Sequence, residues 1–303
     1  MRKKEVRVLR FSHFSMATTF ELLTPGGDEE YARQVSQAVF AEVDRLERLF
    51  NRFDPCSEIG QINLLKPGQS LMIGVETYEC LKTALSIWSE TRGAFDISFA
   101  SLLTYKEEKD KALPVDKAGS LQSIELSRTW RGFRLKYSPR FKKEEGQGAC
   151  IDLGGIGKGF ALDRAAEIVS DWGLERALLH AGTSTALALG SPAHNSSERE
   201  GWMVGVGGKW KIKKMKKEFL LKDRALSGSG TEVKGSHIFD PRKGETASGH
   251  LAAWASHPSA AVSDALSTAF MAMSTEEVRA FCCEHPEVWA MVIIDPERFE
   301  VFE

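Results

Sequence analysis

The stretch Ile151 to Asp163 reads IDLGGIGKGFALD, and it is the most informative segment of the chain. The preceding run ACIDL ends in a glycine cluster, after which apolar residues recur at helical spacing to about Trp172. The runs ERALLHAG and ALALG follow, and both are typical of strands. The centre of the chain is therefore predicted to be a strand, a glycine turn, a helix and two further strands.

The glycine cluster differs from the best-known phosphate-binding loops. A Walker A loop would need glycine in place of Asp152 and Ser or Thr in place of Gly159, and a dinucleotide fingerprint would need glycine in place of Phe160. A glycine turn at a helix N-terminus still offers backbone N–H groups and a positive dipole end to an anion, and Lys158 adds a charge. Two interpretations stay open: an anion-binding turn, and a tight turn beside a solvated lysine.

Outside this centre, the sequence predicts a mixture of strands and helices. Before the centre, we expect a strand pair in Glu5–Leu23 turning near Ser12–His13, helices over Asp28–Phe50 and Glu76–Thr91, and a surface connection over Lys106–Ser120. Short strands at 123–126 and 132–137 then lead into the centre. After it, we expect a hairpin of Trp202–Val206 and Glu218–Leu226 around a lysine-rich turn, a strand at 251–255 and a helix from about Ser263. Because strands and helices do not alternate regularly, an α+β fold is favoured over a doubly wound sheet. We expect one domain over residues 1–303, or two closely packed lobes.

Composition and charge place the chain among soluble globular proteins. Hydrophobic residues make up 42% and charged residues 27%, and 40 Lys and Arg nearly balance 42 Asp and Glu, for a net charge of −2. No global field therefore draws the protein to nucleic acid or to anionic lipid. The five cysteines form no C-x-x-C pair. No apolar run reaches the roughly 18 residues of a membrane span, and the charged N-terminus contains no apolar core of the kind that a signal peptide needs. We expect a cytoplasmic protein as given, or a periplasmic or lipid-anchored one if a leader was removed.

Asp264 and Thr268 stand four residues apart on the last strong helix, so their side chains lie on one face. Oxygen ligands of this kind suit magnesium, which takes few protein ligands and fills its shell with water and substrate phosphate. The alternative is structural, with Asp264 favouring the start of the helix and Thr268 bonded to its own helix. His237 stands just before a Pro-containing turn and near Asp240, and the other histidines show no spacing that predicts metal ligation.

Six motifs, taken in order, resemble those of the ApbE-type FAD:protein FMN transferases. The segment IDLGGIGKGFALD resembles the family's I-D-L-G-G-I-A-K-G-Y-A-V-D, and SDALSTA resembles A-D-A-L-A-T-A. The other four are Met16-Ala17-Thr18 against M-G-T, Asn51 to Asn63 against an aromatic-x-P-x-S-E segment closing on L-N, Gly93 to Asp96 against G-x-F-D, and Ser236 to Gly244 against H-H-I-x-D-P-R-T-G. The resemblance covers most of the chain.

The resemblance implies an α+β fold of the ApbE type, related to the T-fold, with mixed sheets and packed helices. It implies transfer of FMN from FAD to a Thr or Ser hydroxyl of a partner flavoprotein, with release of AMP. Magnesium would lie between a backbone carbonyl of Gly155 and the side chains of Asp264 and Thr268, and His237 would be the general base. The implied FAD contacts, with the Phe53 ring packing on the ligand, are Met16, Phe53, Ala94, Phe95, Asp96, Asp152, Lys158, His237 and Ile238.

The sequence departs from the family pattern at a few positions. Ser184 replaces an acidic residue, Gly228 and Lys243 replace threonines, and Ala17 replaces a glycine. We expect these changes to affect the site more than the fold. Three functions stay open: the transferase, a magnesium-dependent FAD pyrophosphatase that gives FMN to water, and a non-catalytic FAD-binding protein.

Overall fold

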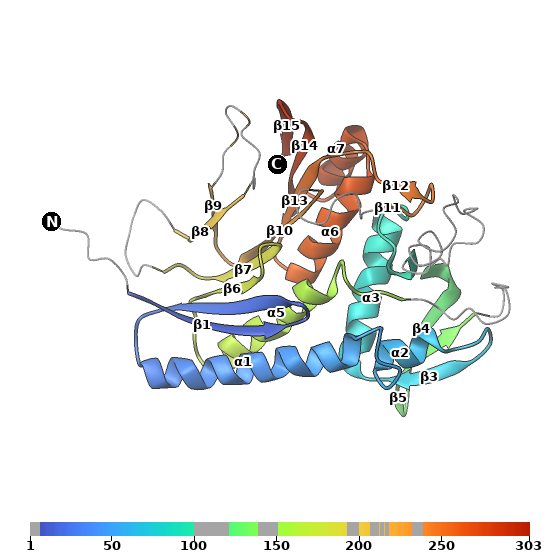
Figure 1. Cartoon of the computed structure of the whole chain (residues 1–303), viewed down its shortest axis with the longest axis horizontal. Coiled ribbons are helices and arrows are strands. Elements are labelled where there is room, and N and C mark those ends of the chain that lie inside the picture. The colour runs from blue at the N-terminus through green and yellow to red at the C-terminus, as the bar shows by residue number, and fades with distance from the viewer. Residues whose placement is uncertain are drawn as a thin grey trace.

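An antiparallel sheet of eight strands runs through the centre of the protein (Figure 1). The structure is a computed structural model, and it describes residues 7–99, 121–138, 151–192, 200–206, 212, 215, 218–231 and 239–303. In spatial order the strands are β1 (Val8–Ser15), β2 (Thr18–Pro25), β6 (Ala177–Ala181), β7 (Thr185–Leu189), β10 (Arg224–Gly230), β13 (Ala252–His257), β14 (Trp289–Asp295) and β15 (Arg298–Phe302). This arrangement of strands with packed helices confirms the α+β prediction.

Both faces of this sheet are covered, because apolar side chains point to both sides of its strands. In β6, Ala177 and Leu179 belong to the main core, whereas Leu178 belongs to a separate apolar layer on the opposite face. A hairpin of β8 (Trp202–Gly205) and β9 (Glu218–Leu221) packs on that opposite layer. The predicted hairpin is therefore confirmed, although its second strand is shorter than expected and β10 begins separately.

Helices pack on the face of the sheet that carries the main core (Figure 1). The helices on this face are α1 (Glu29–Phe50), α5 (Gly157–Asp171), α6 (Ala260–Ala272) and α7 (Thr275–Glu284), and α3 (Val75–Glu90) packs against α6. The start of α1 is fixed by Asp28, whose carboxylate accepts the N–H groups of Glu30 and Tyr31. The end of α3 is marked by Gly93, which adopts a φ of +81° and donates to the carbonyl of Trp88 at 2.8 Å. The helices predicted over Asp28–Phe50 and Glu76–Thr91 are thus confirmed with their end signals.

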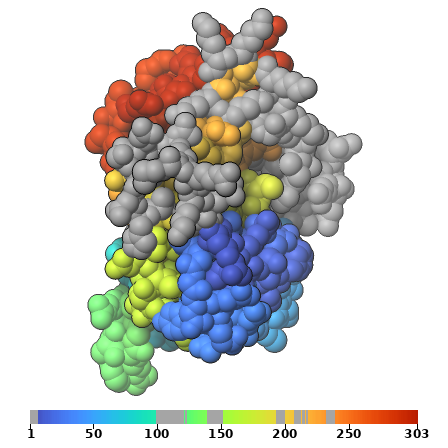
Figure 2. All heavy atoms as spheres, turned by 90° about the vertical axis from the view of Figure 1, so that its left-hand side faces the viewer, coloured from blue at the N-terminus to red at the C-terminus, as the bar shows by residue number. Residues whose placement is uncertain are grey.

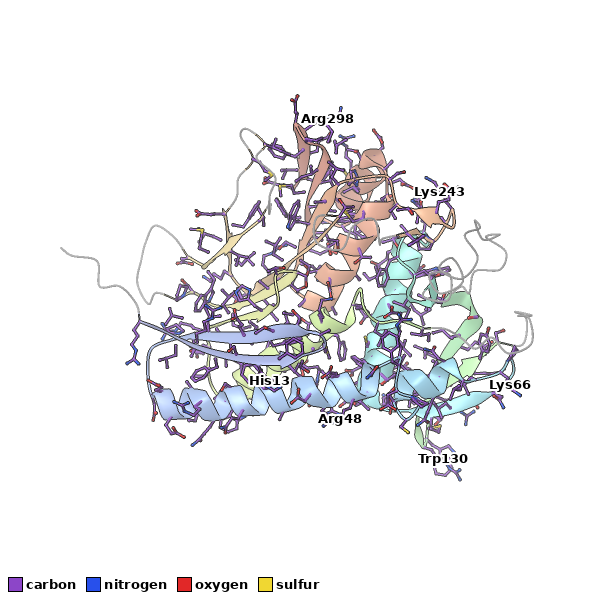
Figure 3. All side chains as sticks on the ribbon, in the orientation of Figure 1. His13, Arg48, Lys66, Trp130, Lys243 and Arg298 are labelled. Atoms are coloured by element: carbon purple, nitrogen blue, oxygen red, sulfur yellow. The ribbon has the colours of Figure 1, made fainter. Side chains whose placement is uncertain are left out.

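A second sheet of three strands, in the order β3-β5-β4, packs against α3. Its strands are β3 (Ser70–Ile73), β4 (Ile124–Thr129) and β5 (Gly132–Tyr137), and the short helix α2 (Glu58–Asn63) precedes it in the chain. The β4–β5 hairpin projects from the body of the protein (Figure 2), and its turn residue Trp130 points away from the ribbon (Figure 3). A two-stranded pair, β11 (Phe239–Asp240) and β12 (Glu245–Thr246), follows β10 in the sequence.

The first strand pair is confirmed, but its turn lies later than predicted. β1 continues through Ser12 and His13, and the turn is formed by Met16 and Ala17. Both turn residues have positive φ, 48° and 57°, as a two-residue type I′ hairpin requires. His13 lies on the strand above α1 (Figure 3), where its Nε2 is 2.8 Å from Asp44 Oδ1. The polar character of this segment therefore reflects a contact with α1 rather than a turn.

The predicted strand before the glycine turn is wrong for the described residues Ile151–Leu153, which lie in no sheet. Their backbone pairs with a side chain instead: Asn63 Nδ2 donates to the carbonyl of Ile151 at 2.9 Å, and the Ile151 N–H donates to Asn63 Oδ1 at 2.5 Å. The Asp152 N–H donates to the carbonyl of Ile97 at 2.8 Å. A buried extended run is satisfied here without a neighbouring strand.

The helix α6 begins at Ala260, about one turn before the predicted start at Ser263. The hydroxyl of Ser259 caps it and accepts the N–H of Val262 at 3.3 Å. Ser263 is fully buried inside the helix, and its hydroxyl donates to the carbonyl of Ala255 at 2.7 Å. No acidic residue lies in the first turn of α6, so interaction with the helix start does not account for an aspartate at position 264.

Three predicted features lie outside the described residues: the connection Lys106–Ser120, most of the lysine-rich turn after Val206, and the segment around His237. Within the described ranges, none of the helices combines the length and the apolar character that crossing a bilayer requires.

Candidate functional site

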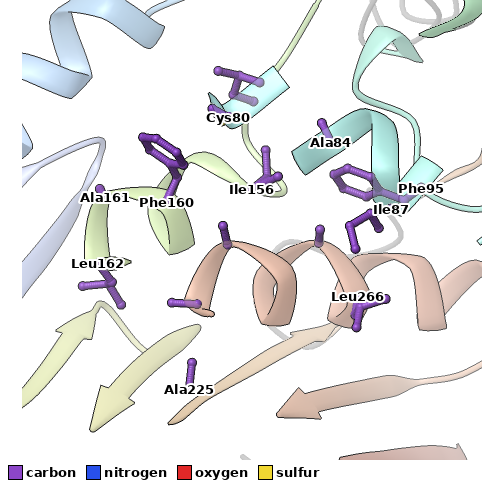
Figure 4. Close-up of a cluster of buried hydrophobic side chains, with 14 of the residues drawn as sticks. Cys80, Ala84, Ile87, Phe95, Ile156, Phe160, Ala161, Leu162, Ala225 and Leu266 are labelled. Atoms are coloured by element: carbon purple, nitrogen blue, oxygen red, sulfur yellow. The ribbon is translucent and has the colours of Figure 1, made fainter. Parts of the chain in front are cut away.

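The glycine turn lies between the extended run Ile151–Leu153 and the first turn of α5. The N–H groups of Ile156 and Gly157 both donate to the carbonyl of Leu153, at 3.0 and 2.7 Å, so the helix starts inside the glycine cluster. Ile156 is fully buried, and its side chain lies near α6 together with Phe95 (Figure 4). Burial of Ile156 anchors the turn against the core.

The helices α5 and α6 touch at Gly159, where one backbone meets the other. A Cβ at this position would overlap the carbonyl oxygen of Ala260, so only glycine fits. The N–H of Gly159 donates to Oδ2 of Asp264 at 3.2 Å. This glycine of the cluster therefore sets the separation of the two helices and contacts a predicted metal ligand.

One helical turn further along α5, the carboxylate of Asp163 caps α6. It accepts hydrogen bonds from the Ser259 hydroxyl at 2.7 Å and from the N–H groups of Ala260 and Ala261 at 2.6 and 2.9 Å. Burial raises the pKa of Asp163, and these hydrogen bonds oppose that shift. The cap fixes the N-terminus of α6 relative to α5, and with it the residues that α6 presents to the glycine turn.

Thr268 on α6 faces the glycine turn. A Cβ on Gly155 would lie 3.3 Å from Thr268 Oγ1 and 3.3 Å from the ring of Phe95. The Thr268 hydroxyl donates to the backbone carbonyl of Asp264 at 3.2 Å, as the structural alternative expected. That bond uses the single donor of the hydroxyl and leaves oxygen lone pairs available, so it is compatible with metal ligation.

The carboxylate of Asp264 is only 4% exposed and is held by three groups. Its Oδ2 accepts the Gly159 N–H and lies 3.7 Å from Lys158 Nζ, and its Oδ1 accepts the hydroxyl of Thr185 on β7 at 3.3 Å. Lys158 also donates to the carbonyl of Gly154 at 2.9 Å. The lysine therefore lies between the turn and Asp264 rather than extending into solvent.

The donor atoms at this place fit magnesium. A carboxylate, a hydroxyl and a backbone carbonyl are hard oxygen donors, and the ion needs only a few of them from the protein. Hydrogen bonds from Thr185 and Gly159 use about two of the roughly four lone-pair positions of the Asp264 carboxylate. In the part of the chain that the structure describes, no group of three His, Cys, Asp or Glu could hold a metal. A cation at this place would therefore rest on one carboxylate and on neutral oxygens.

Asp152 connects the glycine turn to the loop that follows α1. Its Oδ1 accepts the N–H of Gly154 at 2.8 Å, and its Oδ2 lies 3.3 Å from Arg52 Nε. The guanidinium of Arg52 lies over the ring of Phe53, with its Cζ 4.4 Å from the ring centroid. The Phe53 ring is 79% exposed, so it offers a surface on which a planar ligand can stack.

The segment Ala94–Asp96 approaches the turn from α3. Ala94 and Phe95 are buried, and the ring of Phe95 lies 3.3 Å from the place that a Cβ on Gly155 would occupy. Asp96 Oδ1 accepts the N–H and the hydroxyl of Ser98, at 2.8 and 2.6 Å. Burial raises the pKa of Asp96, and these hydrogen bonds oppose the shift.

The structure brings most of the predicted site residues to one place. Around the glycine turn lie Phe53, Phe95, Asp152, Gly155, Lys158, Asp264 and Thr268. Met16 lies in the β1–β2 turn and packs against the main core, and His237 and Ile238 lie outside the described residues. Sequence reasoning missed the roles of Arg52, Asp163 and Thr185, because their partners are far away in the chain and no local spacing reveals them.

The departures from the family pattern at Gly228 and Ser184 lie on and beside the central sheet. Gly228 on β10 lies directly opposite Trp254 on β13, and a Cβ at position 228 would lie 2.5 Å from the indole nitrogen. That side of the strand faces the β8–β9 layer, whereas the hydroxyl of the neighbouring Ser229 lies 3.0 Å from a serine hydroxyl of α6. Ser184 lies in the β6–β7 turn, where its hydroxyl donates to the carbonyl of Ala181 at 3.1 Å. The change at Gly228 therefore alters packing on the side of the sheet away from the glycine turn.

Comparison with known proteins gives relatives over nearly the whole chain. A curated FAD:protein FMN transferase of Klebsiella pneumoniae (strain 342) is 22% identical over an alignment of 303 positions. This match covers 95% of this chain and 85% of the relative. A second, from Chlamydia pneumoniae, is 23% identical over an alignment of 276 positions, and the match covers 83% of this chain and 80% of the relative. The similarity is weak per residue but continuous.

Solved structures share the fold. The ApbE protein of Thermotoga maritima superposes with a TM-score of 0.78 at 24% identity, covering 98% of this chain and 97% of the other. The flavinyl transferase ApbE of Pseudomonas stutzeri, in its apo form, gives 0.78 at 19% identity and covers 100% and 98% of the two chains. The model of the ApbE family matches residues 16–293. With residues 16–293 matched by the family model, the chain belongs to the ApbE family.

Proposed function

We propose that this protein transfers FMN from FAD to a Thr or Ser hydroxyl of a partner flavoprotein and releases AMP, with magnesium as cofactor. The observation that carries the proposal is the meeting of the glycine turn with α6, where Gly155, Lys158, Asp264 and Thr268 lie together. The names of the curated relatives support the same reaction. A helix N-terminus with a lysine beside it suits a pyrophosphate, and a carboxylate beside a hydroxyl suits its metal ion.

Magnesium would be held by the Gly155 carbonyl, the Asp264 carboxylate and the Thr268 hydroxyl, and it would offset negative charge on the pyrophosphate. The Nζ of Lys158 lies 3.7 Å from Oδ2 of Asp264. When a cation binds the Asp264 carboxylate in place of the lysine, the ammonium group can turn to a phosphate oxygen. Thr185 and the Gly159 N–H keep the carboxylate in one orientation throughout.

The proposed reaction is a displacement at phosphorus. The acceptor hydroxyl oxygen forms a bond to the FMN phosphorus, the bond from that phosphorus to the bridging oxygen breaks, and AMP leaves with that oxygen. The hydroxyl proton passes to the general base, for which His237 is our candidate. Phe53 would stack on a ring of the ligand and hold FAD across the turn.

The test is incubation of the protein with FAD, magnesium and candidate acceptor proteins, with AMP release and in-gel flavin fluorescence measured together. A fluorescent acceptor band with AMP in equal amount supports the transferase. AMP without any labelled protein would indicate a FAD pyrophosphatase, and FAD binding without AMP would indicate a non-catalytic flavin binder.

The role of His237 is tested by measuring FAD affinity and the single-turnover rate of AMP release on the His237→Ala variant. A general base predicts a rate lower by about 10²- to 10⁴-fold with little change in affinity. Weakened binding with a normal rate from the bound complex would refute the base assignment.

A further inference from the structure

The loop after α1 holds Arg52 and Phe53 in a fixed backbone conformation. The side chain of Asn51 accepts the N–H of Phe53 at 3.0 Å, and the carbonyl of Asn51 accepts the hydroxyl of Ser57 at 2.6 Å and the N–H of Asp54 at 3.2 Å. Such a hydrogen-bonded loop pre-sets where its side chains project. The contacts of Arg52 are therefore a built feature of this loop.

The charges beside the glycine turn come in two separate pairs. Asp264 faces Lys158 at 3.7 Å, and Asp152 faces Arg52 at 3.3 Å. The Asp152 carboxylate is about one-third exposed, so an unpaired negative charge there would repel a phosphate arriving at the turn. Arg52 is the cation that offsets this charge, because Lys158 is engaged on the other side.

The same guanidinium also packs on an aromatic ring. Its Cζ lies 4.4 Å from the centroid of the Phe53 ring, a distance typical of a cation–π contact. Arg52 therefore links the exposed ring to Asp152, and Asp152 in turn accepts the N–H of Gly154 in the turn. A flexible exposed side chain is in this way fixed relative to the backbone of the turn.

From these contacts we infer that Arg52 is a positioning residue for FAD. It neutralises Asp152 beside the path of the pyrophosphate and holds the Phe53 ring as a preformed stacking surface. The inference rests on the proposed binding of FAD and goes beyond it, because Arg52 is not among the FAD contacts that the resemblance implies and has no part in the proposed reaction. It also explains how an exposed phenylalanine can serve as a defined part of a binding site.

The electrostatic part is tested by a double-variant cycle with FAD affinity measured by flavin fluorescence. Arg52→Ala should weaken FAD binding by about five- to tenfold, through loss of an ion pair and a cation–π contact. Asp152→Asn placed in the Arg52→Ala background should recover part of that loss, because it removes the uncompensated carboxylate. Because Asp152 is itself among the implied FAD contacts, Asp152→Asn alone is the reference, and an equal effect of Asp152→Asn on FAD affinity in the wild-type and Arg52→Ala backgrounds overturns the neutralising role.

The stacking part is tested with riboflavin, which carries the flavin ring but no phosphate. Arg52→Ala should weaken riboflavin binding less than FAD binding, and Arg52→Lys should restore FAD affinity only in part, since it keeps the charge and loses the planar contact. If riboflavin affinity is unchanged in both variants, the positioning of Phe53 is wrong. The effect on turnover should appear in KM with kcat nearly constant.

Arg128→Ala is the matched control, because Arg128 lies 5.9 Å over the ring of Phe133 in the second sheet. It should leave FAD affinity unchanged. Wild-type protein that does not bind FAD would contradict the proposed function, whereas wild-type binding with unchanged affinity in Arg52→Ala would overturn only the role of Arg52.

Discussion

The backbone N–H of Gly159 donates to the carboxylate of Asp264 at 3.2 Å, across the closest approach of α5 and α6. The acid proposed to hold the metal is therefore oriented by a glycine of the helix that follows the turn. The glycine cluster thus has two structural consequences: it exposes backbone at the turn, and it allows α6 to come near enough for its side chains to reach that backbone.

Replacement of Gly159 by alanine should destabilise the protein, because the added Cβ would overlap the Ala260 carbonyl. We expect the free energy of unfolding to fall by about 1 to 3 kcal/mol, with weaker FAD turnover since α6 must shift. Thermal unfolding and AMP release are the measurements. Gly27→Ala, where nothing lies within 4 Å of the added atom, is the control and should be close to wild type.

Asp264→Asn should lower magnesium-dependent AMP release by more than about 100-fold, because the amide removes the only charged ligand of the proposed site. The variant keeps the shape of the side chain, and circular dichroism should show an intact fold. Asp171→Asn, at the exposed end of α5, is the control. Turnover near the wild-type level in Asp264→Asn would remove this residue from the site.

Asp163→Ala should cost about 2 to 4 kcal/mol of stability, since it removes a helix cap and leaves buried donors on Ser259 and Ala260 without their partner. Asp163→Asn keeps one acceptor oxygen and should lose less. Urea unfolding of the two variants gives the comparison. Equal losses in both would mean that the charge, rather than the number of acceptors, decides the effect.

Stability should decrease as the pH falls below about 6.5, the value of an unperturbed histidine. Burial lowers the pKa of His257, and its Nδ1 accepts the N–H of Ser259 at 2.9 Å, so the folded state keeps the ring neutral. The unfolded chain then takes up the proton first, and acid favours unfolding. His180 and His250 shift in the same direction. Melting temperatures between pH 7.5 and 5.5 check this, and His257→Asn should reduce the slope.

Restoring the family's threonine at position 228 should destabilise this protein by about 1 to 3 kcal/mol, because its Cβ would meet the Trp254 indole. The pair Gly228→Thr and Trp254→Ala should cost less than the sum of the single changes, since the smaller residue opposite makes room. Additive losses in thermal unfolding would show that the two positions are independent.

The helices α1, α3 and α5 were predictable because their apolar periodicity is local, and for α1 and α3 the end signals are local too. Asp264 and Thr268 share a helix face whatever the rest of the chain does, and the spacing alone brought them together. The start of α6 was not predictable in this way. Ser259 and Ser263 are both able to cap a helix, and the choice is made by Asp163, which lies on another helix.

The strand before the glycine turn shows a second limit. Ile151–Leu153 has the composition of a strand, and its buried backbone does require partners. One of these partners is the side-chain amide of Asn63. This contact depends on the tertiary structure, so no pattern within the run itself predicts it. The contact of Arg52 with Asp152 is hidden for the same reason, since the two residues are far apart in sequence.

The pairing of Asn63 with Ile151 has a consequence for the changes of chain length that the protein can accept. The two residues lie 88 positions apart, yet their atoms meet, so the chain between them forms a loop that is closed at its base, and α3 within this loop packs against α6. A loop closed at its base tolerates changes of length cheaply, at about 0.6 kcal/mol for each doubling. Trp130 in the β4–β5 turn, within this loop, is 87% exposed, so insertions or deletions at this turn should be tolerated without moving the glycine turn.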